Sequence, residues 1–318
     1  MSELTDDAAG LTDDAAGKAG GRAAGGAWIG HVAMFAFAAL VAASYSIGAV
    51  AAPLVDPAAL NAMRFVIGTA MMGAALLALL GPRGFRFPQA SWRFLVLGAL
   101  MAVFMLTMFT ALQFTGPVST GAVFTLMPLM SAGFGWLFLG QVPRPAVVAS
   151  LLLAGAGAVW VIFRGDLAAL LAFDLGRGEA IFLIGCIAHA AYAPLVPRLN
   201  RGEPILSFTF YTLLATLLCV VVWGVGDIAT TDWAALPAIV WIAIAYLAVF
   251  TTAGTFFLLQ FASMRLPASK VMAYTYLTPS FIILYEGLVG HGWAGPSVAA
   301  GAGITVLGLI LLVATPGA

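Results

Sequence analysis

The chain has 318 residues, of which 63% are hydrophobic and 8% are charged, and its formal net charge is zero. Its mean hydropathy is +1.06. A soluble domain carries about 25% charged residues, so the composition excludes a water-soluble protein and indicates an integral membrane protein. It also excludes disordered, fibrous and disulfide-rich classes, and it offers no basic face for nucleic acid.

The N-terminal residues 1–27 differ from the rest of the chain. They repeat the heptapeptide LTDDAAG at 4–10 and 11–17, and they are acidic and rich in Gly and Ala. Such a segment cannot bury enough apolar surface to fold, so we expect a disordered cytoplasmic tail. The apolar run that follows, 28–50, is longer than the roughly 7–15 residues of a secretory signal. It is therefore predicted to be a retained membrane helix.

Ten apolar stretches are long enough to cross a bilayer, which takes about 20 residues. They are separated by turn sequences such as Gly81-Pro82-Arg83-Gly84. We expect helices, because barrel strands would alternate in polarity and be half as long. The predicted spans run near 28–50, 59–80, 92–113, 118–139, 145–163, 179–199, 204–226, 234–260, 268–290 and 294–314.

Positive charges are distributed unevenly between the connections. The odd-numbered connections carry only Arg164 and Arg177. By the positive-inside rule, both termini are predicted to be cytoplasmic. The N-terminal tail and the even-numbered connections carry Lys18, Arg22, Arg83, Arg86, Arg93, Arg144, Arg198, Arg201, Arg265 and Lys270.

The two halves of the chain match at two constant offsets. One four-residue insertion, near Met264-Arg265, accounts for the change of offset. Because each half holds five spans, the second copy must enter the membrane inverted, as in many secondary transporters. We therefore expect an all-α membrane protein of ten transmembrane helices, with repeats at 28–163 and 179–314 and an extracytoplasmic connector at 164–178. The matched pairs are Tyr45 with Tyr192, Pro57 with Pro204 and Gln113 with Gln260, 147 residues apart, then Pro128 with Pro279, Pro145 with Pro296 and Gly157 with Gly308, 151 apart.

Within this pattern, the sequence Ser119-Thr-Gly-Ala-Val-Phe-Thr-Leu-Met-Pro128, followed by Leu139-Gly140-Gln141, resembles the drug/metabolite transporter superfamily, EamA type. Arg64-Phe65 is similar to the family's Arg in its second span. The family's usual Leu-Gly-Glu lacks its glutamate in both halves, where Gln141 and Gly292 stand, so no role is carried over from that residue. Among bacterial members, the YddG-type aromatic amino-acid exporters look most similar. The resemblance covers about residues 28–314.

The resemblance implies a secondary transporter in a bacterial inner membrane. It would export small metabolites by alternating access, and neutral or aromatic amino acids are the substrates we expect. Plastid and Golgi relatives carry sugar phosphates and nucleotide sugars, so a carrier of that kind is the alternative within the family. A receptor or an intramembrane enzyme is the alternative outside it. The oligomeric state stays open.

Pro128 and Pro279 lie in the middle of the fourth and ninth spans and are related by the repeat. A proline removes one helix hydrogen bond and pushes against the carbonyl four residues back, here that of Phe124 or Thr275. We interpret the pair as hinges beside a cavity. The alternative is two static bends.

The substrate cavity is expected near the midplane, between the repeats. On the ninth span, Lys270, Tyr274, Thr278, Phe281 and Tyr285 share one helix face, which either lines the cavity or forms a helix–helix seam. On the third span a methionine stripe is either core or an adaptable substrate wall. The predicted substrate-binding residues are Tyr45, Met101, Met105, His189, Tyr192, Tyr246, Tyr274, Thr278 and Phe281.

Ionisable residues within the predicted spans include His189, Glu286 and Arg64. His189 and Glu286 are candidates for a proton or charge site, because ionisable residues inside a membrane are expensive. The alternatives are a neutral His189 bonded to a backbone carbonyl and a Glu286 that reaches the interface. Arg64 is expected to extend to the interface or to pair with Asp56.

Other chemistries find no support in the sequence. Cys186 and Cys219 lack the spacing of a metal site, and there is no Walker A or HExxH motif. We therefore expect no enzyme activity, no metal and no cofactor. The partners we expect are the lipid bilayer and a small-molecule substrate.

Overall fold

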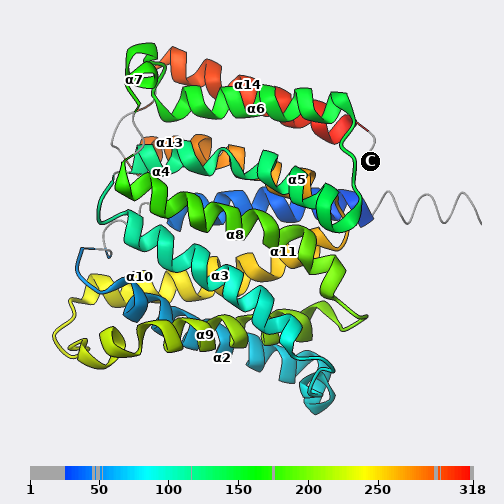
Figure 1. Cartoon of the computed structure of the whole chain (residues 1–318). Coiled ribbons are helices and arrows are strands. Elements are labelled where there is room, and N and C mark those ends of the chain that lie inside the picture. Colours follow the sequence, from blue (N-terminus) through cyan, green and yellow to red (C-terminus); the bar gives the residue numbers. More distant parts are fainter. Residues whose placement is uncertain are drawn as a thin grey trace, which may run out of the picture.

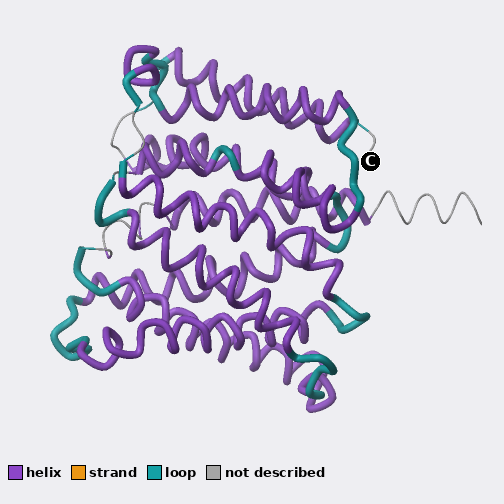
Figure 2. The backbone as a smooth tube through the Cα atoms, in the orientation of Figure 1, coloured by secondary structure: helices purple, strands orange, loops and turns teal. Residues whose placement is uncertain are grey.

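A computed structural model describes residues 26–44, 47, 51, 53–115, 117–173, 176–289, 293 and 295–315. Every regular element in these residues is helical, and Figure 2 shows the helices packed roughly side by side as one bundle. Eight helices of the described chain are apolar and long enough to cross a membrane. These features agree with the membrane protein that the composition indicates.

The eight long helices follow the predicted spans closely. The second long helix, Pro57–Phe85, ends in a 3₁₀ turn, η1 (Gly81–Phe85). The seventh, Ala238–Ser263, contains the turn η2 (Val249–Gly254) between α10 (Ala238–Ala248) and α11 (Thr255–Ser263). The eight are the N-terminal helix Gly26–Ser44, α2 (Pro57–Leu80), α3 (Trp92–Ala111), α6 (Pro145–Ile162), α8 (Arg177–Leu199), α9 (Ile205–Thr230), the segment Ala238–Ser263 and α14 (Pro296–Ala314).

The predicted fourth and ninth spans are not single helices. The fourth consists of α4 (Pro117–Phe124) and α5 (Met127–Leu139). The ninth consists of α12 (Ala268–Ala273), the 3₁₀ turn η3 (Tyr274–Leu277) and α13 (Thr278–Val289). Neither is among the eight long helices, because each is divided near its middle.

A proline stands at each division. Pro128 is the second residue of α5, and Pro279 is the second residue of α13. Proline is tolerated in the first turn of a helix, where its missing N–H has no partner in any case, but not in the interior. At Pro279 the carbonyl of Thr275 accepts a hydrogen bond from the N–H of Thr278, as in a 3₁₀ turn. Function as hinges stays a prediction for both prolines.

Helices α6 and α14 form the closest pair at one side of the bundle (Figure 1). A Cβ added to Gly157 would lie 2.6 Å from the backbone N of Thr305, and one added to Gly308 would lie 2.6 Å from that of Ala154. As the residue number rises along α6 it falls along α14, so the helices run antiparallel. Small residues at these positions let the two backbones approach.

Both ends of the described chain lie at one end of the bundle, on the right in Figure 1. A Cβ added to Gly30 would lie 3.0 Å from the side chain of Leu266, in the connection between α11 and α12. The Lys270 ammonium donates to the carbonyl of Thr315, 2.5 Å away. The connections between α2 and α3, α5 and α6, and α8 and α9 lie at this same end. Most of the positive residues outside the helix interiors therefore gather there.

The connector after α6 contains a short helix, α7 (Leu167–Leu171), which the sequence analysis did not foresee. Asp166 begins it, since its carboxylate accepts hydrogen bonds from the N–H groups of Ala168 and Ala169. An acidic residue at this position is a favourable N-cap. The helix is too short to cross a membrane.

Candidate functional site

A cavity lies among the N-terminal helix, α2, α3, α4, α8 and the η2–α11 segment. The space between its walls amounts to about 490 Å³, including the part that is open to solvent. Most of its lining is aromatic, aliphatic or methionine side chains, as is usual for a small-molecule site. The described lining residues are Phe37, Val41, Ser44, Arg64, Met101, Phe104, Met105, Met108, Phe124, His189, Thr251, Thr255, Phe256 and Leu259.

Arg64 is the cationic residue of this lining, and it is only 2% exposed. Its Nε donates to Thr252 Oγ1 at 2.9 Å, and one Nη donates to the carbonyl and to the hydroxyl of Thr251, each at 3.2 Å. The guanidinium also lies 5.9 Å from the ring centre of Phe109. It is thus held between α2, α3 and η2, inside the bundle.

This position contradicts the sequence interpretation of Arg64. Neither an interfacial side chain nor a pair with Asp56 is correct. The Asp56 carboxylate instead caps the N-terminus of α2, where it accepts hydrogen bonds from the N–H of Ala58 at 2.7 Å and of Ala59 at 3.4 Å. The sequence did not show that Thr251 and Thr252, far along the chain, would face Arg64.

The partners of Arg64 belong to an irregular turn. Residues Val249–Gly254 form a π-helical turn between α10 and α11. Within it, the Thr251 carbonyl accepts from Arg64 and from Thr255 Oγ1, the latter at 2.7 Å. π-Turns inside α-helices are rare and frequently occur at functional sites. This turn was not predicted from the sequence, because no proline or other local signal marks it.

His189 lies across the lining on α8 and is 2% exposed. Its ring centre is 4.2 Å from that of Phe104 and 6.2 Å from that of Tyr192. Neither ring nitrogen has a hydrogen-bond partner in the part of the chain that the structure describes. The alternative of a backbone carbonyl partner is therefore not what the structure shows. A buried polar group without a partner costs about 1–3 kcal/mol, so a cavity-facing ligand or water is its natural partner.

Among the predicted substrate-binding residues, Met101, Met105 and His189 line the cavity. Tyr192 lies behind the lining. Its hydroxyl accepts a hydrogen bond of 2.7 Å from Gln260 Nε2, and Gln260 Oε1 accepts one of 2.5 Å from Thr209. This buried network joins α8, α11 and α9 beside the cavity.

The polar face of the ninth span packs against the N-terminal helix. Tyr274 lies 3.0 Å from Nδ1 of His31, Phe281 packs edge-on against Phe35, and Tyr285 donates to the carbonyl of Ala39 at 3.1 Å. Because His31, Phe35 and Ala39 follow at intervals of four, the two faces form a continuous seam. This is the helix–helix seam that the sequence analysis held as the alternative.

The remaining predicted residues lie elsewhere or cannot be placed. Thr278 is buried, and its hydroxyl has no partner among the described residues. Tyr246 is half-buried and reaches the carbonyl of Leu40 at 3.5 Å. Tyr45 lies outside the described residues, and so does the side chain of Glu286, whose backbone belongs to α13.

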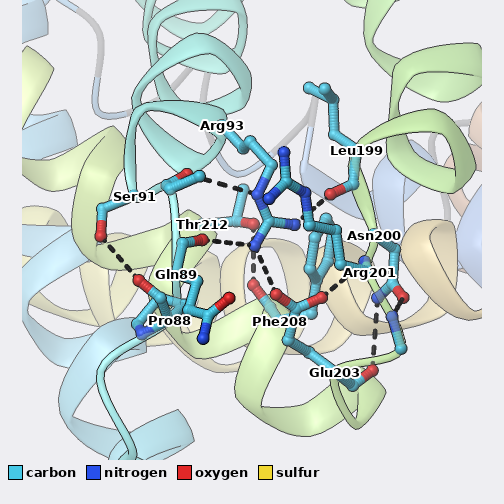
Figure 3. Close-up of polar contacts among 12 residues, drawn as sticks. Pro88, Gln89, Ser91, Arg93, Leu199, Asn200, Arg201, Glu203, Phe208 and Thr212 are labelled. Carbon is cyan, nitrogen blue, oxygen red and sulfur yellow. Dashed lines mark hydrogen bonds and ion pairs between the residues drawn. The ribbon is translucent and has the colours of Figure 1, made fainter.

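A second polar cluster lies at the end of the bundle that carries the positive charges (Figure 3). Arg93, 1% exposed, donates to the Glu203 carboxylate at 2.5 Å, to the carbonyl of Gln89 at 2.8 Å and to that of Leu199. Burial raises the pKa of the Glu203 carboxyl, but hydrogen bonds from Arg93 and from the N–H of Arg201 outweigh it and hold that pKa below its usual value. The cluster fixes the start of α3 to the connection between α8 and α9.

Comparison with known proteins places this architecture in a family. The sequence profile of the EamA-like transporter family matches the chain twice, at residues 28–163 and 176–314. The chain belongs to the EamA-like transporter family. This EamA-like protein is also 23% identical over 261 residues to the "Uncharacterized transporter YyaM" of Bacillus subtilis (strain 168), covering 82% of this chain and 86% of that one.

A solved crystal structure shares the fold of this EamA-like protein. It superposes with a TM-score of 0.73 at 22% sequence identity, covering 91% of this chain and 96% of the other. The profile and the Bacillus subtilis relative together indicate a multi-pass membrane transporter. No catalytic role is indicated by either of them.

Proposed function

We propose that this EamA-like protein is a secondary transporter that exports neutral or aromatic amino acids, or amphipathic metabolites of similar size, across the bacterial inner membrane. The observation that carries the proposal is the cavity among the helices, with its Phe and Met walls and a buried Arg64. Methionine and aromatic walls accommodate apolar side chains of different shape. The resemblance to YddG-type exporters supports the same substrate class.

The proposal includes ten transmembrane helices in two inverted five-helix repeats. The α4–α5 segment is then the fourth span, and the α12–α13 segment is the ninth. Support comes from the two matches of the family profile and from the antiparallel pairing of α6 with α14. Gly157 and Gly308, which make equivalent close approaches in that pair, are also equivalent in the proposed repeat.

Orientation follows from charge. We place both termini in the cytoplasm, because the connections that carry Arg144, Arg201 and Arg265 lie at the end of the bundle where the N-terminal helix begins and α14 ends. Positive residues are retained on the cytoplasmic side of bacterial membranes. Arg164 and Arg177 then lie outside.

Alternating access is the mechanism that we propose. The two repeats would rock about the divided spans at Pro128 and Pro279, opening the cavity to one side at a time. His189 is the candidate for a proton site, because its unbonded ring lines the cavity. Glu286 stays a second candidate from the sequence alone.

The other functions find less support. A dianionic phosphate ester needs several cations, whereas Arg64 is the one cation among the described lining residues. A receptor or an intramembrane enzyme finds no support in the family or in the named relative.

Counterflow in proteoliposomes tests the proposal. Vesicles with the purified protein are loaded with unlabelled L-phenylalanine or L-leucine and diluted into a trace of the labelled compound. We expect transient, saturable uptake above that of protein-free vesicles. Flux of neither compound in either direction would refute the amino-acid assignment.

A further inference from the structure

We infer that the cavity binds its ligand through a carboxylate held by Arg64, and that an ammonium group on the ligand contributes little to binding. The inference rests on the proposed transport function and goes further in naming the chemistry that selects the substrate. It makes the substrate class small monocarboxylates with an apolar body, of which amino acids are one kind.

The first support is the charge state of the site. Arg64 donates only to Thr252 and Thr251, and no carboxylate contacts it among the described residues. A buried charge without a counter-ion is expensive, and charged residues within membranes commonly mark substrate pathways. Asp56, the N-cap of the same helix, lies about 12 Å away along the axis at 1.5 Å per residue. Its carboxylate is already bonded to the first N–H groups of α2. A ligand anion is the missing counter-ion.

Unused donors of Arg64 are the second support. A guanidinium carries five N–H donors in a planar fork that suits the two oxygens of a carboxylate. Nε and one Nη of Arg64 are used, whereas the other Nη makes no hydrogen bond to a described residue. Because Arg64 belongs to the cavity lining, that nitrogen is available for a ligand.

The shape of the cavity supplies the third support. Arg64 lies over the ring of Phe109, and His189 lies tilted against Phe104, so the two polar groups contact α3 five residues apart, or about 7.5 Å along its axis. Met105 and Phe124, among other apolar side chains, form the wall of the same cavity. A ligand with its anion at Arg64 therefore extends its apolar body along this wall toward His189.

The lining also explains why an ammonium group is dispensable. Its described residues include the hydroxyls of Ser44, Thr251 and Thr255 but no carboxylate. All three hydroxyls donate to backbone carbonyls, and Thr251 Oγ1 also accepts from Arg64, so an ammonium would meet only neutral oxygen atoms among these described side chains. Charge complementarity therefore favours a net anion over a zwitterion.

Three probes that share a phenyl ring separate the contribution of the ligand's carboxylate from that of its ammonium group. They are L-phenylalanine, 3-phenylpropionate, which lacks the ammonium, and phenethylamine, which lacks the carboxylate. Thermal stabilisation of the purified protein reports binding of each. We expect 3-phenylpropionate to bind within a few-fold of L-phenylalanine and phenethylamine to bind about 10- to 100-fold more weakly, as for loss of a hydrogen bond to a charged group.

A variant set assigns the selectivity to Arg64. Arg64→Gln keeps a hydrogen-bonding side chain but removes the charge, and we expect it to bind 3-phenylpropionate and phenethylamine about equally. Arg201→Ala removes a positive charge from an exposed connection outside the lining and should keep the wild-type order. If Arg64→Gln fails to fold, the three probes on the wild-type protein still decide.

The outcomes also separate this inference from the proposed function. If the wild type bound phenethylamine as well as or better than 3-phenylpropionate, or if Arg64→Gln kept the wild-type selectivity, the inference would be wrong. L-phenylalanine flux in the same protein would still support the transport function. Absence of both binding and flux for L-phenylalanine and 3-phenylpropionate would overturn both.

Discussion

Arg93 of α3 and Glu203 of the α8–α9 connection form an ion pair of 2.5 Å at the charged end of the bundle. The pair joins α3 to a connection that is 110 residues away in sequence. Arg93 is almost fully buried, whereas the Glu203 side chain is 20% exposed. Removing the acid therefore leaves a buried guanidinium with backbone carbonyls as its remaining partners.

Glu203→Gln should lower stability by about 1–3 kcal/mol at neutral pH, the cost of losing a charged hydrogen-bond partner. The folded protein holds the pKa of Glu203 below its ordinary value of 4.5. The stabilisation is therefore present above pH 4.5 and is lost as the pH falls through the lowered pKa. Apparent melting temperatures between pH 7 and pH 3 should fall more steeply for the wild type than for the variant and converge at the acid end.

Arg201→Ala is the matched control for this pair. It removes an exposed charge from the same connection, yet only the backbone N–H of Arg201 bonds Glu203. The control should keep the acid dependence of the wild type. Parallel melting curves for Glu203→Gln and the wild type across the pH range would contradict the assignment.

The second prediction concerns the α6–α14 contact. A methyl group at Gly308 would lie 2.6 Å from the backbone of Ala154, whereas one at Gly303 on the same helix would meet nothing within 4 Å. Backbone cannot yield as a flexible side chain does. Gly308→Ala should therefore cost about 1–3 kcal/mol, as overpacking does, and Gly303→Ala should leave the apparent melting temperature unchanged or slightly raised. Equal effects at both positions would show that the helices do not approach closely there.

Much of the fold could be predicted from the sequence, for a physical reason. Span positions follow from the length of apolar runs, which the bilayer dictates, and α3 and α6 begin as predicted, at Trp92 and Pro145. Proline chemistry is equally local, and both divided spans restart at the residue before Pro128 or Pro279. The π-turn at Val249–Gly254 carries no comparable local signal.

The site was less predictable because it depends on contacts between distant segments. Helical spacing shows which residues share a face, but not which neighbour that face meets. Tyr274 and Phe281 were thus predicted for the cavity, yet they pack against the N-terminal helix. Arg64 was misplaced for the same reason, since its partner Thr252 is 188 residues away in sequence.

The third prediction separates stability from transport at His189. His189→Leu replaces an unbonded buried ring with an apolar side chain, which is neutral or stabilising when no hydrogen bond is lost. We expect an unchanged or higher apparent melting temperature together with at least a several-fold slower counterflow. His189→Gln, which keeps hydrogen-bonding atoms, should recover part of the flux.

Measuring that flux at pH 6 and pH 8 tests the proton site. A wild-type pH dependence that disappears in both His189 variants supports coupling through this ring. Wild-type flux and pH dependence in His189→Leu would remove His189 from the mechanism.

The last prediction concerns the divided spans. Pro128→Ala and Pro279→Ala restore a backbone N–H at positions where it can bond to the preceding turn, so each span can become more continuous. A stiffer span should slow the exchange between the two faces of the membrane while the binding site is preserved. We expect counterflow to fall several-fold, with the affinity for 3-phenylpropionate, measured by thermal stabilisation, within about two-fold of wild type. Pro145→Ala is the control, because a proline at the first residue of α6 interrupts nothing. Unchanged counterflow in both variants would show that the two interrupted spans are static bends. If the affinity for 3-phenylpropionate fell together with counterflow, the prolines would be maintaining the geometry of the binding site and not acting as hinges.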